Sequence, residues 1–475
     1  MDTKALRQKI LDLAIHGKLV PQDPNDEPAS VLLELIKAEK ERLIKEGKIK
    51  RSKKSAKSSN TPHYENVPFE LPNSWVWCRL EDIAYVASGS TPDKTCFVEN
   101  GVPYIKMYNL RNQKIDFAYH PQYITEEVHN GKLQRSRAEV GDLIMNIVGP
   151  PLGKLAIIPT TLPQANFNQA AVLIRPYKFK EVLVSYLKIY LEEMSEINSI
   201  ATRGSAGQVN ISLTQSQNMR IPIPPLNEVR RIIEEVSKYD ILIDSLKQNI
   251  TDIQNLIAYT KSKILDLAIH GKLVPQDPND EPAIELLKRI NPDFTPCDNG
   301  HYPVGWIETI LGELFSHNTG KALNSSNKEG IFKDYLTTSN VYWNKFDFTA
   351  IKQMPFKESE LNKCTVTKGD LLVCEGGDIG RSAIWNYDYD ICIQNHIHRL
   401  RPKIDLCVPF YYYTFAYLKE NNLIGGKGIG LLGLSSNALH KIEMPLPPLA
   451  EQQRIVQKIE ELFSVLDNIQ NALEV

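Results

Sequence analysis

One segment, KILDLAIHGKLVPQDPNDEPA, stands at positions 9–29 and again, unchanged, at 263–283. A sequence this long and varied does not recur by chance. Other anchors repeat at nearly constant spacing: the Pro-x-x-Trp pattern occurs at 72–75 and at 303–306, and IPIPPLNE (221–228) matches MPLPPLAE (444–451). Repeats of this kind are the strongest guide to architecture, and they indicate two equivalent halves joined in one chain.

Each half keeps a second set of short anchors while the sequence between them has diverged. Gly-Asp-Leu occurs at 141–143 and 369–371, and Arg-Pro at 175–176 and 401–402. GPPLGK (149–154) aligns with GGDIGR (376–381), so both halves keep the pattern G-x-x-x-G-[KR]. Constant anchors around divergent segments predict one fold, present twice, that carries two different surfaces.

Hydrophobic patterning predicts a mixed α/β domain in each half. Short apolar runs bounded by Gly or Pro predict strands, and longer runs with helical spacing predict helices. The predicted strands are 142–148, 170–176, 370–375 and 391–402, and the predicted helices are 182–197 and 409–422. The expected unit is an α/β domain of roughly 150 residues, a common domain size.

A long helix is expected after each PPL motif. Apolar residues step alternately by four and three from Ile232 to Ile257 and from Ile455 to Leu473, a seam typical of coiled coils. An amphipathic helix on a domain surface is the alternative, but it normally shows a wider apolar stripe. A continuous helix from 226 to 270 would span about 65 Å and set a spacing.

The two ends of the chain complete this pattern. By the repeat, Met1 corresponds to Asn255 and Val475 to Asp252. Residues 1–20 therefore correspond to the C-terminal half of the long helix, which the 449–475 helix lacks. We therefore expect two α/β domains in a pseudo-two-fold arrangement, separated by long antiparallel coiled-coil helices. The predicted segments are 1–66 (helix and basic linker), 67–225 (first domain), 226–298 (central helix and joint), 299–448 (second domain) and 449–475 (last helix).

Composition excludes several classes of protein. The formal net charge is −2, so the chain is not a general polycation, and any nucleic-acid binding must depend on local arrangement of charge. The seven cysteines form no C-x-x-C pair, which favours reduced thiols in a cytoplasmic protein. No apolar run reaches membrane-spanning length, so no association with a membrane is expected. The basic stretch 45–60 is interpreted as a solvated linker, with a phosphate-contacting arm as the alternative.

No catalytic or metal site is predicted. GPPLGK has too few residues between its glycines for a P-loop and lacks the following Ser or Thr. His396 and His398 alternate on a predicted strand, so both rings would face one side, but no Cys or carboxylate completes a metal site and a surface or packed pair is favoured. The [DN]-P-P-[FY] pattern used by amino-methyltransferases is absent.

Several polar stretches are suited to base edges or phosphates, because cations and amides pair with guanine, adenine and backbone oxygens. KMYNLRNQK (106–114) is matched in place, but not in identity, by TTSNVYWNK (337–345). The glycine loops carry a cation, although a tight turn with a merely solvated cation is an alternative. The candidates are Lys106, Asn109, Arg111, Lys154, Arg203 and Gln208 in the first half, and Thr338, Asn340, Asn344, Arg381 and Lys427 in the second.

These segments together resemble one known family. LDLAIHGKLVPQ (twice), LPNSWVWCRLEDIA (71–84), IPIPPLNEVRRI (221–232) and MPLPPLAEQQRI (444–455) are similar to the specificity subunit of type I restriction–modification enzymes. The resemblance implies a non-catalytic subunit whose two target-recognition domains each read half of a split double-stranded DNA site. It also implies two methyltransferase partners and motor–nuclease partners, which would carry the S-adenosylmethionine, ATP and magnesium chemistry, leaving no cofactor in this chain.

Two other functions and two origins of the repeat stay open. An enzyme with an active site in each half would keep the same polar residues, yet Lys106-Met107 in the first half aligns with Thr337-Thr338 in the second. A purely structural coiled-coil scaffold would not explain why the domains have diverged. In the exact repeat, Gly ends the helix and prolines prevent its return, which suits a structural joint. Recent gene exchange between the halves would explain why the copies are identical. Alternatively, each copy presents the same surface, which includes Leu19 or Leu273, to one of two identical methyltransferase subunits.

Overall fold

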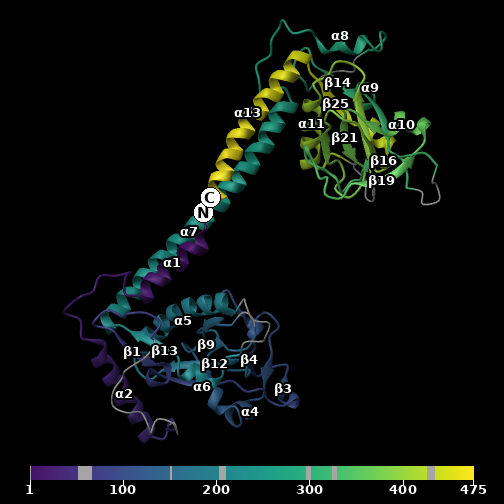
Figure 1. The fold of residues 1–475 in the computed structure, drawn as a ribbon. Coiled ribbons are helices and arrows are strands. Elements are labelled where there is room, and N and C mark those ends of the chain that lie inside the picture. The colour runs from purple at the N-terminus through teal and green to yellow at the C-terminus, as the bar shows by residue number, and fades with distance from the viewer. Residues whose placement is uncertain are drawn as a thin grey trace. The chain divides into compact units, whose positions relative to one another are not determined.

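The computed structural model describes residues 2–51, 67–149, 152–202, 210–295, 301–323, 329–424 and 434–474, and for 195–202 it gives the backbone alone. It divides into two compact units, Asp2–Gln248 and Asn249–Val475 (Figure 1). The helix α7 (Leu226–Ile269) begins in the first unit and ends in the second. Its bounds agree with the helix predicted at 226–270.

In the first unit, helices flank a strand-rich centre. The helices are α1 (Thr3–Ile15), α2 (Ala29–Lys45), α3 (Leu80–Ile83), α4 (Glu126–Asn130), α5 (Lys180–Thr202) and α6 (Leu213–Gln217). The strands are β1 (Val76–Arg79), β2 (Ala84–Ser88), β3 (Phe97–Val98), β4 (Val102–Ile105), β5 (Leu110–Arg111), β6 (Lys114–Ile115), β7 (Tyr123–Ile124), β8 (Ala138–Glu139), β9 (Leu143–Asn146), β10 (Leu155–Ile157), β11 (Gln164–Phe167), β12 (Ala171–Pro176) and β13 (Arg220–Ile223).

The second unit repeats this order of elements. Its helices are α8 (Ala283–Lys288), α9 (Leu311–Leu314), α10 (Glu358–Cys364), α11 (Val408–Glu420), α12 (Ser436–His440) and α13 (Leu449–Glu474). Its strands are β14 (Ile307–Ile310), β15 (Phe315–Thr319), β16 (Ile331–Leu336), β17 (Val341–Tyr342), β18 (Lys345–Phe346), β19 (Lys352–Phe356), β20 (Thr365–Val366), β21 (Leu371–Cys374), β22 (Ser382–Ile384), β23 (Ile391–Ile393), β24 (Ile397–Pro402) and β25 (Glu443–Leu446).

The sheets have the same topology in both units. A four-stranded antiparallel sheet has the order β10-β9-β12-β2 in the first unit, and the corresponding order in the second is β22-β21-β24-β15. A second sheet has the order β3-β7-β4-β11-β8 in the first unit and β19-β16-β23-β20 in the other. The prediction of one mixed α/β fold present twice is therefore confirmed.

One predicted strand is wrong. Residues 391–402 form two strands, because β23 pairs with β16 in one sheet while β24 pairs with β21 in the other. The polar residues between them form the crossing turn, and the first unit has the same break between β11 and β12. His396 therefore lies in the turn, exposed and 3.2 Å from Glu375, whereas His398 is buried, so the two rings do not share one face.

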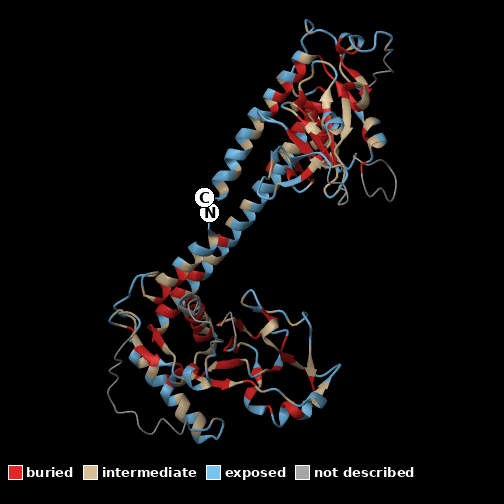
Figure 2. Ribbon diagram, turned by 45° about the vertical axis from the view of Figure 1, so that its right-hand side comes forward, coloured by how far each residue is buried: buried red, intermediate tan, exposed pale blue. Residues whose placement is uncertain are grey.

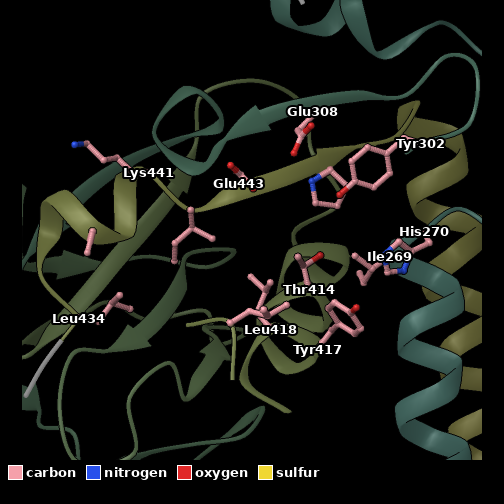
Figure 3. A pocket seen from close by; sticks show the side chains of 14 residues that line it. Ile269, His270, Tyr302, Glu308, Thr414, Tyr417, Leu418, Leu434, Lys441 and Glu443 are labelled. Carbon is pink, nitrogen blue, oxygen red and sulfur yellow. The ribbon is translucent and has the colours of Figure 1, made fainter. Parts of the chain in front are cut away.

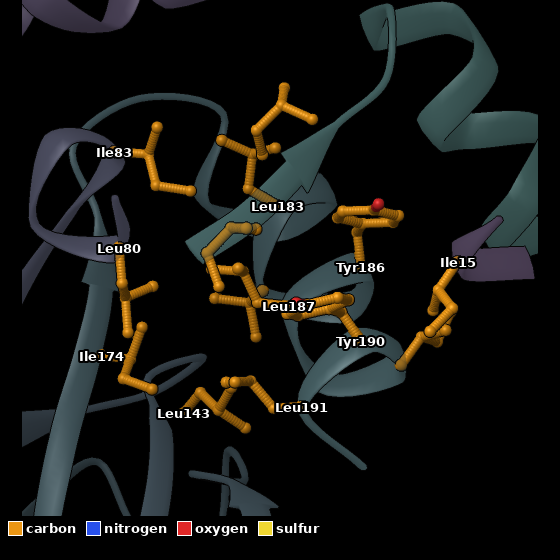
Figure 4. Close-up of a cluster of buried hydrophobic side chains, with 14 of the residues drawn as sticks. Ile15, Leu80, Ile83, Leu143, Ile174, Leu183, Tyr186, Leu187, Tyr190 and Leu191 are labelled. Atoms are coloured by element: carbon orange, nitrogen blue, oxygen red, sulfur yellow. The ribbon is translucent and has the colours of Figure 1, made fainter. Parts of the chain in front are cut away.

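The main core of each unit lies between the four-stranded sheet and one helix. In the first unit, Leu183, Leu187 and Tyr190 of α5 recur at helical spacing and pack against Leu143 and Ile174 of the sheet (Figure 4). The helix α11 has the corresponding place in the second unit. Burial of each such side chain contributes about 1.5–3 kcal/mol to stability.

The matched Gly-Asp-Leu and Arg-Pro anchors are joined by an ion pair within each sheet. Arg175 contacts both carboxylate oxygens of the fully buried Asp142, with its Nε 2.9 Å from Oδ1. Arg401 and Asp370 repeat this bidentate pair, with Nε 2.7 Å from Oδ1. In both sheets the pair satisfies a buried carboxylate, which in the first unit is also contacted by Lys180 at 2.7 Å.

Within each unit, part of α7 runs antiparallel to another helix. In the first unit α1 pairs with it, and Arg7 Nε lies 2.9 Å from Asp240 Oδ1. In the second unit α13 pairs with it, and Lys261 lies 2.5 Å from Asp467. Figure 1 shows α1 and α13 beside different stretches of α7. The middle of α7 is more exposed than the predicted seam required, and Ile253 is 38% exposed (Figure 2).

The exact repeat folds back against the helix that follows each PPL motif. Arg231 bonds Asp26 at 2.6 Å, and Arg454 bonds Asp280 at 2.5 Å. The glycine that ends the helix adopts left-handed φ values of 66° and 65° in the two copies, and a Cβ there would lie 2.5 Å from Pro72 or Pro303. These contacts explain the structural part of the repetition, including the Pro-x-x-Trp anchors.

None of the helices in the described ranges is long and apolar enough to cross a lipid bilayer.

Replacing Arg454 with Ala is expected to lower the free energy of unfolding of the second unit by about 1–3 kcal/mol, because the Asp280 carboxylate, 9% exposed, loses its counterion. Arg231→Ala should have the same effect on the first unit. Hydrogen exchange followed by mass spectrometry separates the two units. Unchanged exchange in the strands of the affected unit would contradict a stabilising role for the pair.

A histidine cluster makes the second unit sensitive to acid. His317 bonds His398 at 2.8 Å, His398 donates to the Leu434 carbonyl at 2.7 Å, and the His440 ring lies 4.8 Å from His317. Burial, followed by the charges of His398, His440 and Arg399, lowers the pKa of His317 to about 4. Burial also lowers the pKa of His398, although the Glu375 carboxylate acts in the opposite direction.

Because the folded state lowers the pKa values of His317 and His398, the unfolded chain binds more protons below pH 6.5. The stability of the second unit should therefore fall as pH drops from about 6.5 towards 4. Val86 and Val172 stand at the corresponding strand positions of the first unit, which serves as the control. Equal acid destabilisation of both units, measured by hydrogen exchange of β24 and β12, would contradict this expectation.

Candidate nucleic-acid interface

Both polar stretches predicted to face nucleic acid form a short hairpin. In the first unit a 3₁₀ turn (Met107–Asn109) leads from β4 into the hairpin β5–β6, with Arg111 paired to Lys114. In the second unit β16 leads into the hairpin β17–β18, with Tyr342 paired to Lys345. We call these the first and second hairpins. They occupy the same place in the two folds and share the exposed Lys114 and Lys345, but Arg111 stands opposite Tyr342 and Asn112 opposite Trp343.

One buried asparagine fixes the base of each hairpin. Asn109 accepts the Lys106 amide at 2.9 Å and donates to the carbonyls of Asp116 and Tyr119. Asn340 is 2% exposed, accepts the Thr337 amide at 2.8 Å and donates to the Asp347 carbonyl. The sequence predicted contact with DNA, at base edges or phosphates, for both amides. The structure instead assigns them a structural role, because buried amides with these partners are not available to a ligand.

Each hairpin rests on the strand that follows the glycine loop. Gln113 of the first hairpin accepts the Leu155 amide at 2.7 Å, and the Asn344 amide of the second donates to the Ser382 carbonyl at 3.1 Å. Just before these strands, Gly153 and Gly380 have φ values of 74° and 84°, a left-handed turn that favours glycine. Hairpin and glycine-loop cation, predicted separately, therefore come together in both units.

In the first unit three of the cations predicted from the sequence lie in this region, and Lys114 of the hairpin adds a fourth. Arg111 is exposed and its guanidinium lies 4.2 Å from the Tyr119 ring centroid. Lys106 is half-buried, with its ammonium 5.8 Å from the Phe97 ring. Lys154 is also half-buried, and its backbone amide bonds the Asn146 side chain at 2.5 Å. These three remain candidates for contact with DNA.

The second unit has a different arrangement. Arg381 lies 5.0 Å from the Tyr342 ring and donates a hydrogen bond to the Thr338 carbonyl. Thr338 is half-buried, whereas Asn344 is exposed at the hairpin tip with a left-handed φ of 50°. Arg203, Gln208 and Lys427, which the sequence also predicted, lie outside the described residues.

Sequence reasoning chose no aromatic residue as a site candidate, although the stretch KMYNLRNQK includes Tyr108. Tyr108, Tyr119 and His120 form a cluster in the first unit, with the Tyr119 and His120 rings 4.5 Å apart. In the second unit Trp343 packs against Tyr412, with 6.2 Å between ring centroids. Unlike the anchors, these residues have no counterpart of the same type in the other half, so the repeat gave no signal for them.

The predicted docking residues Leu19 and Leu273 are half-buried and pack against the cores of their own units. They therefore support the joint itself. Other residues of the repeat are exposed in both copies, among them Lys18 and Glu27 with their counterparts Lys272 and Glu281.

A cavity of about 520 Å³ lies in the second unit (Figure 3). It is lined by His270, Tyr302, Glu308 and Glu443 among others. In the first unit Phe69 lies between His16 and Trp77, with ring centroids 4.1 and 5.1 Å away. By the repeat, Glu308 stands in place of Trp77, so the cavity marks a difference in packing between the halves rather than a shared active site.

Within the described part of the chain, no group of three or more His, Cys, Asp or Glu side chains could hold a metal ion. The two hairpins share Asn109 with Asn340 and Lys114 with Lys345, but their other polar side chains differ, whereas a duplicated active site would keep the whole set. The geometry is that of a duplicated recognition module: one framework that presents different exposed side chains in each copy.

Comparisons with known proteins place this module in a family. The model of the type I restriction modification DNA specificity domain matches residues 72–255 and 303–475, so the chain belongs to this family. It is 28% identical to the specificity subunit of the type I restriction enzyme EcoEI from Escherichia coli, with 99% of this chain and 91% of the relative covered. Identity to the EcoAI specificity subunit of the same species is 27%, with 98% and 90% covered.

Solved structures share the fold. A chain from a study of assembly and conformational transition in the type I R-M system superposes with a TM-score of 0.55 at 20% identity, covering 86% of this chain and 94% of that one. The HsdS subunit from Thermoanaerobacter tengcongensis superposes with a TM-score of 0.50 at 20% identity, covering 85% and 93%.

Replacing Asn109 with Ala is expected to destabilise the first hairpin without altering which bases are preferred. The change leaves the Lys106 amide and two carbonyls without their partner, at a cost of about 1–3 kcal/mol. Urea unfolding measures the loss, and methylation-site mapping measures preference. A changed base at one position with unchanged stability would restore the DNA-contact role predicted from the sequence.

Proposed function

We propose that this chain is the non-catalytic DNA-reading subunit of a type I restriction–modification complex. Each recognition domain (67–225 and 299–448) reads one half of a bipartite, asymmetric site. The observation that carries the proposal is the pair of hairpins: buried asparagines, ion pairs and glycine turns are shared, while several exposed positions differ, above all Arg111 opposite Tyr342. A shared framework with different contact residues is what two different half-sites require.

The proposed contacts lie in the major groove, because only there does each base pair present a distinct pattern of donors and acceptors. The cations beside the hairpins would contact bases or phosphates. With a net charge of −2, the chain offers little general attraction to DNA. Partner subunits would therefore supply much of the affinity for the DNA phosphates. Contacts with phosphates are the part of DNA binding that depends on salt concentration.

The helix α7 supports a spacer role. Its 44 residues form one uninterrupted helix, and a helix of this length extends about 66 Å. The antiparallel partners α1 and α13 stiffen the stretches that they contact. In this proposal the number of base pairs between half-sites depends on the length of α7.

The exact repeat is proposed to dock two identical methyltransferase subunits, one on each copy. Its buried residues are explained by the joint, but its exposed residues, including Lys18 and Lys272, have no such structural reason for identity. S-adenosylmethionine, ATP and magnesium would be bound by the methyltransferase and motor–nuclease partners rather than by this chain.

The proposed function is tested by mapping methylated bases in cells that express the chain with its methyltransferase partner. The expected result is a bipartite motif with two different half-sites. A continuous palindrome, or methylation independent of this chain, would contradict the proposal.

The docking proposal predicts a change in stoichiometry. Two methyltransferase subunits per chain are expected for the unaltered protein, one for Lys18→Glu or Lys272→Glu, and none for the double variant, because reversal of charge opposes the same contact at each copy. Native mass spectrometry counts the subunits. Lys94→Glu, an exposed lysine outside the repeat, is the matched control. Two subunits bound to the double variant would exclude these lysines from the interface.

A further inference from the structure

We propose that Arg111 reads a guanine in the half-site of the first recognition domain, and that Tyr119 positions it. The inference rests on the proposed function and adds the chemical identity of one base. It follows from the arrangement of the Arg111 side chain, the support beneath it and a comparison with the other cations of both hairpins.

The Arg111 guanidinium is presented with its donors free. Its backbone is fixed in β5 by pairing with Lys114, its side chain is exposed, and its guanidinium lies 4.2 Å from the Tyr119 ring centroid. No ion pair or hydrogen bond joins this side chain to another described residue. A guanidinium stacked on an aromatic face keeps its in-plane N–H groups available for two parallel hydrogen bonds.

The supporting tyrosine is itself held in place. The Tyr119 carbonyl accepts a hydrogen bond from Asn109 at 2.7 Å, and its amide donates to Asp116 at 3.3 Å. Its ring contacts His120 at 4.5 Å and Tyr108 at 6.2 Å between centroids. A fixed platform reduces the conformational entropy that Arg111 loses on binding, which makes the contact more selective.

The other cations do not share this geometry. Arg381 also lies over a tyrosine, but it donates to the Thr338 carbonyl, so part of its guanidinium is occupied. Lys106 is half-buried against Phe97 and, like every lysine, offers a point charge in place of a planar pair of donors. By the repeat, Tyr342 takes the place of Arg111 in the second hairpin, so this readout belongs to the first domain alone.

Guanine is the base that fits two parallel donors. Its O6 and N7 atoms are both acceptors on the major-groove edge, whereas adenine places an amino donor beside N7. An arginine facing adenine would therefore lose one hydrogen bond, and one of its N–H donors would face the adenine amino group, which is also a donor. The predicted contact selects a G·C pair at one position of the first half-site.

The test is a thermodynamic cycle on the intact complex of this chain with its methyltransferase partner. The DNA carries the motif found by methylation mapping, with guanine replaced by 7-deazaguanine, which lacks the N7 acceptor. We expect this replacement at the Arg111 position to weaken binding at least about 5-fold. In the complex of the Arg111→Ala variant, the same replacement should not weaken binding further. The methylation motif of this variant should accept other bases at that one position.

Two variants separate positioning from folding. Tyr119→Phe keeps the ring and should retain the dependence on N7, whereas Tyr119→Ala should reduce it without moving the thermal midpoint of the first unit, which contains Tyr119. Lys345→Ala, in the second hairpin, is the matched control and should leave the first half-site unchanged.

The inference is overturned if the first half-site contains no guanine, or if 7-deazaguanine weakens the unaltered complex and the Arg111→Ala complex equally. It is also overturned if Arg111→Ala weakens binding to all sequences alike and lowers the salt dependence by about one phosphate contact, since that result assigns Arg111 to the backbone. Failure of the unaltered complex to methylate a bipartite site would instead contradict the proposed function.

Discussion

Two ion pairs at equivalent places hold the architecture together. Arg231 with Asp26, and Arg454 with Asp280, fasten each copy of the exact repeat to the first turns of a long helix. The Arg231 guanidinium holds the pKa of Asp26 below its usual range, so the carboxylate is charged at neutral pH. Each pair stabilises the same reversal of the chain, from the end of α1 or α7 towards a recognition domain. The neighbouring glycine, held close to Pro72 or Pro303, allows only one path for the turn.

Inside each domain, a constant framework is separated from a variable surface. The Asp142–Arg175 pair and its counterpart Asp370–Arg401 stabilise the sheet, while Asn109 and Asn340 hold the hairpins from below. None of these residues needs to change when the exposed positions change. Arg111 and Tyr342 stand at the same position of two hairpins, with entirely different chemistry. This separation allows recognition to diverge while the fold is kept.

Much of the fold followed from the sequence because the repeat fixed it twice. The long helix, the duplicated α/β domain and the main strands were predicted from anchors and periodicity. The strand at 391–402 was wrong because local patterning cannot show that a chain crosses from one sheet to another at Gln394–His396. The domain boundaries remain predictions.

The candidate site was harder to predict because polarity does not indicate direction. The motif KMYNLRNQK contains Asn109, which is buried, and Arg111, which is exposed, and the polarity of the two side chains does not distinguish them. The importance of Tyr119 depends on a contact formed only after folding. Matched positions in the two halves were the best guide: an amide kept at both 109 and 340 indicates structure, and a residue that differs indicates recognition.

The central claim is that each domain reads its own half-site independently of the other. The most direct measurement maps the methylated motif of a chain in which residues 299–448 are replaced by a second copy of 67–225, expressed with the methyltransferase partner. If the domains are independent, the motif should contain two copies of one half-site. That half-site should be the one whose selectivity is lost when Arg111 is altered. Retention of two different half-sites would contradict the account.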